Sequence, residues 1–358
     1  MQQVQQSTAG VNKAVLDWLL GDEEPSVRYS TLVELLGHDP EEALVQKARG
    51  QIGKKGWAAV ILAKQRDGTY WENPKSCLVP KWASCVWQLI VLADLGVSGE
   101  DPRIKNCANH FLDLHNVETG GFALRPRGSE NFGPHVCMTG NMVRALAKLG
   151  HGTDDRVVKA MDWLAGVQLE DGGWNCYTAE GEGGKHSSFK STQPLWALSE
   201  MLPLKQRQDW SECERKGAEF LLRHRLYMSD VDDSVVSLDF LNAHYPLHYN
   251  YDFLHGLRIL TSLGVREDPR LGQATRLLLE KRKDDGRWLL EGVYRGWRHS
   301  HGTHGSNSVF RPEEREVATQ GWGDGYTQQL EEAGKPSKWI TLQALLVLKR
   351  LEMLASSG

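Results

Sequence analysis

The sequence of 358 residues predicts an all-α protein in which inner and outer helices alternate, as a closed double ring or as an open solenoid. Three observations lead to this prediction: a turn motif that recurs along the chain, helix boundaries that recur between these turns, and the lack of strand-like alternation of apolar and polar residues. With 40% hydrophobic residues, 25% charged residues and a formal net charge of −4, the chain can bury a core, which excludes a disordered protein.

The recurring turn places glycine shortly before an aromatic residue. Its four copies run from Gln65 to Trp71, from His115 to Phe122, from Gln168 to Trp174 and from Lys283 to Trp288. The glycines at positions 68, 121, 173 and 286 are separated by 53, 52 and 113 residues, the last being about twice the first. We therefore predict helix-pair repeats of about 53 residues, with one turn lost between the third and fourth copies.

Two kinds of helix boundary lie between the turns. Apolar segments end in Leu-Gly, where glycine can adopt the positive φ that terminates a helix, and the next segment starts with an aspartate that can cap it. The boundary residues are Gly96, Gly150 and Gly264 at the ends, and Asp101, Asp154 and Asp268 at the starts. The segments after the aspartates are amphipathic, which predicts outer helices, whereas those before the glycines are apolar nearly all round, which predicts inner helices.

The turn residues resemble those of the terpenoid cyclase and protein prenyltransferase superfamily, over about residues 50 to 350. The matching residues are Gln65, Gly68 and Trp71, then Gln168, Gly172 and Trp174, and then Gly286 and Trp288. The resemblance implies a single α/α toroid, similar to single-toroid bacterial proteins that are squalene-cyclase-like or prenyltransferase-like. We expect residues 51–358 to form this toroid, with a long loop insertion at 289–334, and residues 1–50 to form a helical extension packed on the ring.

In such a ring the N-termini of the inner helices surround the mouth of a central cavity, where free N–H groups and positive dipole ends favour ligand binding. At any single position an ordinary cap, turn or core residue would give the same pattern. The repeats, however, bring the first residues of all inner helices to the same end of the ring, which favours a common site there. The candidate substrate-binding residues are Lys81, Trp82, Trp87, Cys137, Asn141, His186, Trp196, His248, Tyr251, Asp252 and Trp339.

A first hypothesis for the function is proton-initiated cyclisation or isomerisation of an isoprenoid-like apolar substrate. The segment Asp230-Val231-Asp232-Asp233 resembles the Asp-x-Asp-Asp motif of class II terpene cyclases, in which clustered carboxylates keep one acid protonated. The resemblance implies that Asp230, Asp232 and Asp233 are catalytic and that no cofactor is required. Their register, however, coincides with the lost turn, where an ordinary polar turn would look the same.

Two further hypotheses stay open. A zinc-dependent, prenyltransferase-like enzyme would need ligands of the types offered by Cys137, Cys176, His186 and Asp252, although the Asp-x-Cys spacing of that family is absent. A non-catalytic toroid would hold an apolar ligand or a protein by burial and by cation–π contacts.

Partners and location follow from what the sequence lacks. There is no run of Lys and Arg for nucleic acid and no apolar stretch long enough for a transmembrane helix, whereas peripheral membrane contact and the oligomeric state stay open. The first ten residues lack the pattern of a signal peptide, and the six cysteines show no CxxC pair, so we expect a cytoplasmic protein with reduced thiols. His299, His301 and His304 are predicted to lie in a solvated loop.

Overall fold

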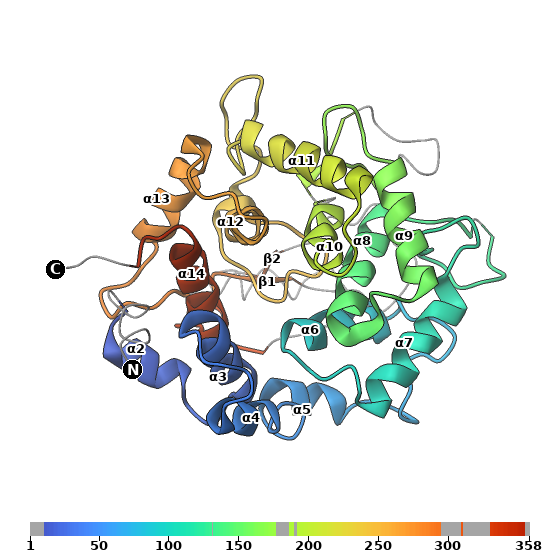
Figure 1. Ribbon diagram of the computed structural model, residues 1–358, viewed down its shortest axis with the longest axis horizontal. Coiled ribbons are helices and arrows are strands. Elements are labelled where there is room, and N and C mark those ends of the chain that lie inside the picture. The colour runs from blue at the N-terminus through green and yellow to red at the C-terminus, as the bar shows by residue number, and fades with distance from the viewer. Residues whose placement is uncertain are drawn as a thin grey trace, which may run out of the picture.

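Two concentric rings of helices make up the computed structural model, which describes residues 11–130, 132–176, 186–189, 192–294, 309–310 and 330–354 (Figure 1). The inner ring contains α3 (Pro25–Ser30), α6 (Cys85–Asp94), α8 (Val136–Leu146), α10 (Gln193–Met201), α12 (Phe253–Ser262) and α14 (Lys338–Arg350). The outer ring contains α2 (Lys13–Leu19), α4 (Ala43–Arg49), α5 (Gly56–Leu62), α7 (Pro102–His115), α9 (Asp155–Gly166), α11 (Gln208–Arg223) and α13 (Gly272–Glu280). The chain is an α/α toroid, as the sequence predicts.

Burial distinguishes the two rings. Every residue of α8 is buried, and α6 is buried from Cys85 to Ala93. The outer helix α7 instead buries a single stripe that includes Ile104, Cys107 and Phe111. A helix that is apolar all round needs neighbours on every side, whereas an amphipathic helix needs them on one side only. The apolar segments therefore form the inner ring, and the amphipathic segments cover it.

The helix boundaries lie where the sequence places them. The side chains of Asp101, Asp154 and Asp268 accept hydrogen bonds from the backbone N–H two residues further on, at 2.9, 2.8 and 2.9 Å. The third of these aspartates caps a short 3-10 turn (Pro269–Leu271) that leads into α13. At the opposite boundaries Gly96, Gly150 and Gly264 have φ values of 72°, 84° and 86°, which side chains other than glycine rarely adopt.

Three turn tryptophans make the same contact in three repeats. The indole Nε1–H groups of Trp71, Trp174 and Trp288 donate to carbonyls in the last turns of α5, α9 and α13, at 2.9, 2.9 and 2.7 Å. The accepting carbonyls belong to Ile61, Leu164 and Leu278, each ten residues before its tryptophan. The last carbonyls of a helix have no partner within the helix, so each tryptophan satisfies one of them while it fills the space between the rings.

Replacement of Trp288 by Phe should lower the free energy of unfolding by about 1–2 kcal/mol, because the ring stays in place while the buried carbonyl of Leu278 loses its donor. Urea denaturation followed by circular dichroism measures this change. Trp163→Phe is the matched control, because Trp163 is only partly buried and its indole N–H donates no hydrogen bond within the described part of the chain. A loss of equal size in both variants would contradict a role for the hydrogen bond.

The fourth repeat, which lacks a turn tryptophan, uses a tyrosine instead. After α11 the Oη of Tyr251 donates to the carbonyl of Leu226 at 2.7 Å, and Tyr251 is 1% exposed. Gly256 allows this approach, since a Cβ atom there would lie 2.2 Å from the Tyr251 hydroxyl. Tyr251, a predicted substrate-binding residue, therefore has a structural role. It holds the chain after α11 in place, where the recurring tryptophan motif is missing from the sequence.

Within residues 1–50, which the sequence assigns to a helical extension, α3 takes a place in the inner ring. Helix α3 and its π-helical continuation, Thr31–Leu35, lie in the inner ring between α14 and α6 (Figure 1). Val27, Leu32 and Leu35 are buried, and Lys349 Nζ donates to the carbonyls of Glu34 and Leu35 at 2.7 and 3.0 Å. Burial of this apolar stripe closes the ring.

Only the two ends of the predicted insertion at 289–334, and residues 309–310 within it, are among the described residues. Strand β1 (Val293–Tyr294) pairs antiparallel with β2 (Val309–Phe310), so the insertion starts with a short ribbon. The ring of Tyr294 stacks on His244 with centroids 4.7 Å apart, which places β1 near the N-terminal end of α12. The predicted loop histidines His299, His301 and His304 lie outside the described residues.

Candidate functional site

A cavity of about 90 Å³ lies at the C-terminal ends of the inner helices. All six inner helices contribute to it or to its rim, most of them through their last turns. Helix α10 also contributes Trp196, and α14 lines the cavity from Trp339 in its first turn to Arg350 in its last. The lining residues are Ser30, Glu34, Asp94, Arg144, Lys148, Trp196, Ser199, Glu200, Arg258, Ser262, Trp339, Gln343 and Arg350. Glu34, Lys148 and Ser262 are exposed, whereas Arg144, Arg258, Trp196 and Trp339 are buried, so the cavity leads from the surface toward the axis of the ring.

Two guanidinium groups lie over one tryptophan in this cavity. The centre of the Arg144 guanidinium is 3.2 Å from the centroid of the Trp196 ring, and that of Arg258 is 4.9 Å from it. Arg258 is also 5.9 Å from the ring of Trp339. The electron-rich faces of tryptophan attract cations, most strongly where water is excluded. Trp196 thereby holds two positive charges together at the axis of the ring.

Of the cationic side chains in the cavity, some form ion pairs with carboxylates and one does not. Arg144 Nη2 lies 2.7 Å from Asp94 Oδ1, and the two side chains are only 5% and 8% exposed. Nearer the surface, Lys148 lies 3.7 Å from Glu200, and Arg350 lies 3.6 Å from Glu34. Arg258 has no carboxylate or hydrogen-bond partner for its side chain among the described residues, although it is only 8% exposed. Burial lowers the pKa of the Arg258 guanidinium, and the nearby Asp94 opposes this effect.

Further polar atoms near the cavity lack partners within the described part of the chain. They include both ring nitrogens of His255, the hydroxyl of Tyr245 and the indole Nε1 of Trp339. His255 contacts Trp196 edge-on at 4.4 Å, and Tyr245 stacks on Trp339 at 4.4 Å. Burial keeps the pKa of His255 well below its ordinary value, so its ring is neutral. Buried polar atoms without partners are costly, and they mark places where water or a ligand binds.

Of the predicted substrate-binding residues, Trp196 and Trp339 line this cavity. Four others gather at the opposite, N-terminal end of the ring: Lys81, Trp82, Trp87 and His248. Trp82 stacks on His248 at 4.0 Å, Trp87 contacts His248 edge-on at 5.5 Å, and Lys81 lies over Trp82 at 4.6 Å and donates to Tyr249. Trp82 is 0% and His248 5% exposed, so these side chains fill the N-terminal end of the ring.

The remaining predicted binding residues have other surroundings. Asn141 is buried in the middle of α8. Asp252 caps α12 by accepting from His255 N at 2.8 Å, and it also accepts from His244 N at 2.9 Å. His186 is exposed, and its carbonyl accepts from Asn175 Nδ2 at 2.9 Å.

The aspartates of the Asp-x-Asp-Asp segment lie in an exposed turn after α11. Asp232 accepts hydrogen bonds from Ser234, Asp233 pairs with Arg225, and Asp230 lies 3.8 Å from His224 Nε2. Hydrogen bonds from Ser234 and Ser229 lower the pKa of Asp232, which is the opposite of what a protonated catalytic acid requires. Their position corresponds to the polar turn that the sequence register indicates.

The predicted set of metal ligands is not assembled. Cys137 and Cys176 form a disulfide bond, which also corrects the expectation of reduced thiols for this pair. His135 lies beside the two sulfurs, whereas Asp252 is engaged at the N-terminus of α12 and His186 contacts Asn175. Cys137 and Cys176 thus lie together as a disulfide, and the histidine beside them is His135, whereas the predicted one is His186.

Arg144, Arg258 and Asp94 were not predicted from the sequence, because free N–H groups point to the N-terminal ends of the inner helices as the place for a ligand. A signal was present in the sequence: Arg144 and Arg258 are isolated basic residues in segments that are otherwise largely apolar, Val136–Leu146 and Phe253–Ser262. A charge on a helix that is buried all round must face a cavity or a partner. This rule would have indicated both arginines.

No protein-family model matches the sequence, and no curated protein matches it. Among solved structures, the type II terpene cyclase MstE from Scytonema is 14% identical over 98% of this chain and 99% of that chain, with a TM-score of 0.47. A protein from Actinoplanes is 15% identical over 94% and 90%, with a TM-score of 0.47, and a family 88 glycosyl hydrolase from Bacteroides vulgatus is 12% identical over 98% of both chains, with a TM-score of 0.44. At such identities the likeness concerns the fold alone.

No helix among the described residues is long and apolar enough to cross a bilayer.

Proposed function

We propose that the toroid binds a small organic anion, a carboxylate or a phosphate with an apolar isoprenoid-like part, in the cavity at the C-terminal ends of the inner helices. The observation that carries this proposal is the buried guanidinium of Arg258, which has aromatic contacts but neither an ion pair nor a hydrogen bond within the described residues. A guanidinium offers five N–H donors in a planar fork that fits a carboxylate or a phosphate. An anion bound there would give the Arg258 guanidinium the hydrogen bonds that it loses when burial removes water from it.

The charges of the cavity support an anionic ligand. Its lining holds four cationic side chains, those of Arg144, Lys148, Arg258 and Arg350, against three carboxylates, those of Glu34, Asp94 and Glu200. The lining is mostly polar, and the rings of Trp196 and Trp339 are its only aromatic groups among the described residues, so the remainder of the ligand would rest on them. The same two arginines weigh against proton-initiated cyclisation in this cavity, since a carbocation formed near Trp196 would be repelled by both. The proposal is therefore for binding.

Isothermal titration with three probes tests the proposal: geranyl phosphate, geraniol and inorganic phosphate. We expect geranyl phosphate to bind more tightly than either of the others, because only it combines the anionic group with the apolar part. Arg258→Gln should weaken its binding by about 10- to 100-fold, which is the effect of losing a hydrogen bond to a charged group. Geraniol binding should not change in this variant.

Arg266→Gln is the matched control, because Arg266 is 55% exposed and pairs only loosely with Glu352, at 3.4 Å. Equal affinity for geraniol and geranyl phosphate would contradict an anion site. Equal affinity for inorganic phosphate and geranyl phosphate would contradict the apolar part. Unchanged binding in Arg258→Gln would place the ligand elsewhere, and Lys81→Gln would then test the N-terminal end of the ring.

A further inference from the structure

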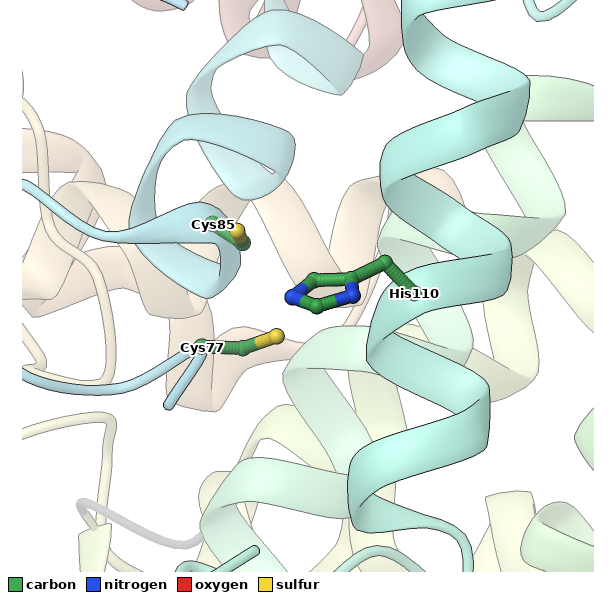
Figure 2. A group of neighbouring side chains, drawn as sticks. All are labelled: Cys77, Cys85 and His110. Atoms are coloured by element: carbon green, nitrogen blue, oxygen red, sulfur yellow. The ribbon is translucent and has the colours of Figure 1, made fainter. Parts of the chain in front are cut away.

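Three potential metal ligands from three neighbouring segments meet between the inner and outer rings, away from the axial cavity. The sulfurs of Cys77 and Cys85 and a ring nitrogen of His110 all lie within 4.8 Å of one another. Cys77 belongs to the segment that leads from the Trp71 turn to α6, Cys85 is the first residue of α6, and His110 is on α7. Figure 2 shows the imidazole of His110 reaching from α7 toward the two cysteines.

A fourth ligand is available from the same outer helix. Cys107 precedes His110 by three residues on α7, so both side chains lie on one face of that helix. Cys107 is 0% exposed, and its thiol lies beside that of Cys85, as the thiol of Cys77 does. The four residues therefore form one connected group, which we call the Cys85 cluster: Cys77, Cys85, Cys107 and His110.

The surroundings of this cluster resemble those of a metal site. All three cysteines are 0% exposed, and the Nε2 atom of His110 is buried without any hydrogen-bond partner in the described part of the chain. The backbone of Cys77 is held on both sides, since its N–H donates to His115 Nε2 at 3.3 Å and its carbonyl accepts from Val86 N at 3.0 Å. His115 is fixed in turn by its Nδ1, 2.8 Å from the carbonyl of Ala123. Such outer contacts orient metal ligands.

We propose that Cys77, Cys85, Cys107 and His110 bind one zinc ion. Three sulfurs and one imidazole nitrogen are a donor set typical of tetrahedral structural zinc, and this ion has no redox chemistry of its own. Zinc–sulfur bonds of about 2.3 Å and zinc–nitrogen bonds of about 2.0–2.1 Å require ligand atoms roughly 3.5–3.8 Å apart, which is compatible with the limit of 4.8 Å that holds among Cys77, Cys85 and His110. Cys107 lies outside this limit and would move toward the ion on binding. On binding, the three thiols release their protons to solvent and the neutral imidazole donates its lone pair.

The zinc ion would join the loop before α6 to the outer helix α7 and so fix the spacing of the two rings at this repeat. With four protein ligands no position is open for substrate, so the role is structural.

The second group of ligand types, His135, Cys137 and Cys176, differs from the Cys85 cluster in two respects. Its two sulfurs are joined in a disulfide, and it offers three residues and not four. It therefore provides an internal control: removal of Cys137 should leave the zinc content unchanged, whereas removal of Cys85 should abolish it.

Metal analysis by mass spectrometry, on the full chain purified without chelators from zinc-supplemented cells, tests the proposal. We expect about one zinc ion per chain in the wild type, and almost none in Cys85→Ser and in His110→Gln. Cys137→Ser should keep its zinc, and so should Cys213→Ser, which removes another buried free cysteine outside the cluster. A wild-type chain without zinc, or variants of Cys85 and His110 that retain it, would overturn the proposal.

Measurements on the wild type keep the proposal testable if these variants fail to fold. Cobalt(II) exchanged into the protein should give the intense visible bands of a tetrahedral ion and a near-ultraviolet band from thiolate ligands. A strong chelator should lower the melting temperature, and zinc should restore it. Weak visible bands typical of six-coordinate cobalt, or a melting temperature that does not respond to the chelator, would each contradict a zinc site of three cysteines and one histidine.

Discussion

Replacement of Asp94 by Ala should lower the free energy of unfolding by about 3–5 kcal/mol, because it leaves the guanidinium of Arg144 buried without its carboxylate. The two groups are 2.7 Å apart, and their side chains are 8% and 5% exposed, so water from the cavity replaces the lost carboxylate only in part. Glu200, at 3.9 Å from Arg144 Nε, is the only other carboxylate paired with Arg144 in the described part of the chain, and it is shared with Lys148. Chemical denaturation of both proteins measures the difference.

The exposed pair of Lys13 and Asp17 provides the control for this prediction. Its nitrogen–oxygen distance is also 2.7 Å, but its side chains are 87% and 62% exposed, so Asp17→Ala should cost less than about 1 kcal/mol. The double replacement Asp94→Leu with Arg144→Met should recover most of the loss, because it removes both buried charges together. Equal losses for Asp94→Ala and Asp17→Ala would show that burial does not govern the strength of the pair near the cavity.

The helix boundaries could be predicted from the sequence because short-range chemistry determines them. An aspartate such as Asp101 caps the residue two positions later, and a glycine such as Gly96 ends a helix by its own φ. The contact from Trp71 to the carbonyl of Ile61 also spans only ten residues. Each of these signals lies within one repeat, so a periodic sequence displays them several times.

The membership of α3 in the ring was not predictable in this way. Its segment, Pro25–Ser30, has neither a turn tryptophan nor an Asp-Pro start, and it joins the ring through contacts with α14 at the far end of the chain. The pairing of Asp94 with Arg144 likewise connects residues of different repeats. Contacts of this kind depend on how the ring closes, which no local pattern records.

The position of the cavity illustrates the same limit. Free N–H groups made the N-terminal ends of the inner helices the natural place to look, yet Trp82 and His248 fill that end. The opposite end is lined by charged side chains such as Lys148 and Arg350, which pair with Glu200 and Glu34 at 3.7 and 3.6 Å and do not pack as closely as stacked rings do. The packing of side chains at the axis, and not the helix dipoles, therefore determines which end of the ring is filled.

A second large effect concerns Glu24, whose replacement by Gln should remove a pH dependence of stability. Burial raises the pKa of Glu24 from 4.5 to about 7, and this effect outweighs the hydrogen bond that Trp57 N donates to its Oε2 at 2.9 Å. Below about pH 4.5 the carboxyl is protonated in both the folded and the unfolded chain. Between 4.5 and about 7 the unfolded chain releases the proton while the folded chain keeps it, so the free energy of unfolding falls as the pH rises through this range.

The size of the effect follows from the shift of the pKa. A difference of about 2.5 units corresponds to about 3 kcal/mol of lost stability above pH 7, and we expect about 2–3 kcal/mol because some water reaches partly buried groups. Glu24→Gln should therefore be more stable than the wild type at pH 8 by about this amount, and close to it at pH 4.5. The amide oxygen can still accept from Trp57 N, which keeps the start of α5 in place.

Urea denaturation of the wild type and Glu24→Gln at several values between pH 4.5 and pH 8 measures the difference directly. Other groups contribute to the pH dependence of both proteins, and the contributions of those that do not interact with Glu24 cancel in the difference. Glu331, whose own pKa is raised by burial and whose charge also raises the pKa of Glu24, adds to that difference. Glu118→Gln is the control, since this side chain is 91% exposed and its replacement should leave the stability unchanged at every pH. A difference between wild type and Glu24→Gln that stays constant from pH 4.5 to pH 8 would show that Glu24 remains ionised in the fold, and that the hydrogen bond from Trp57, and not burial, sets its pKa.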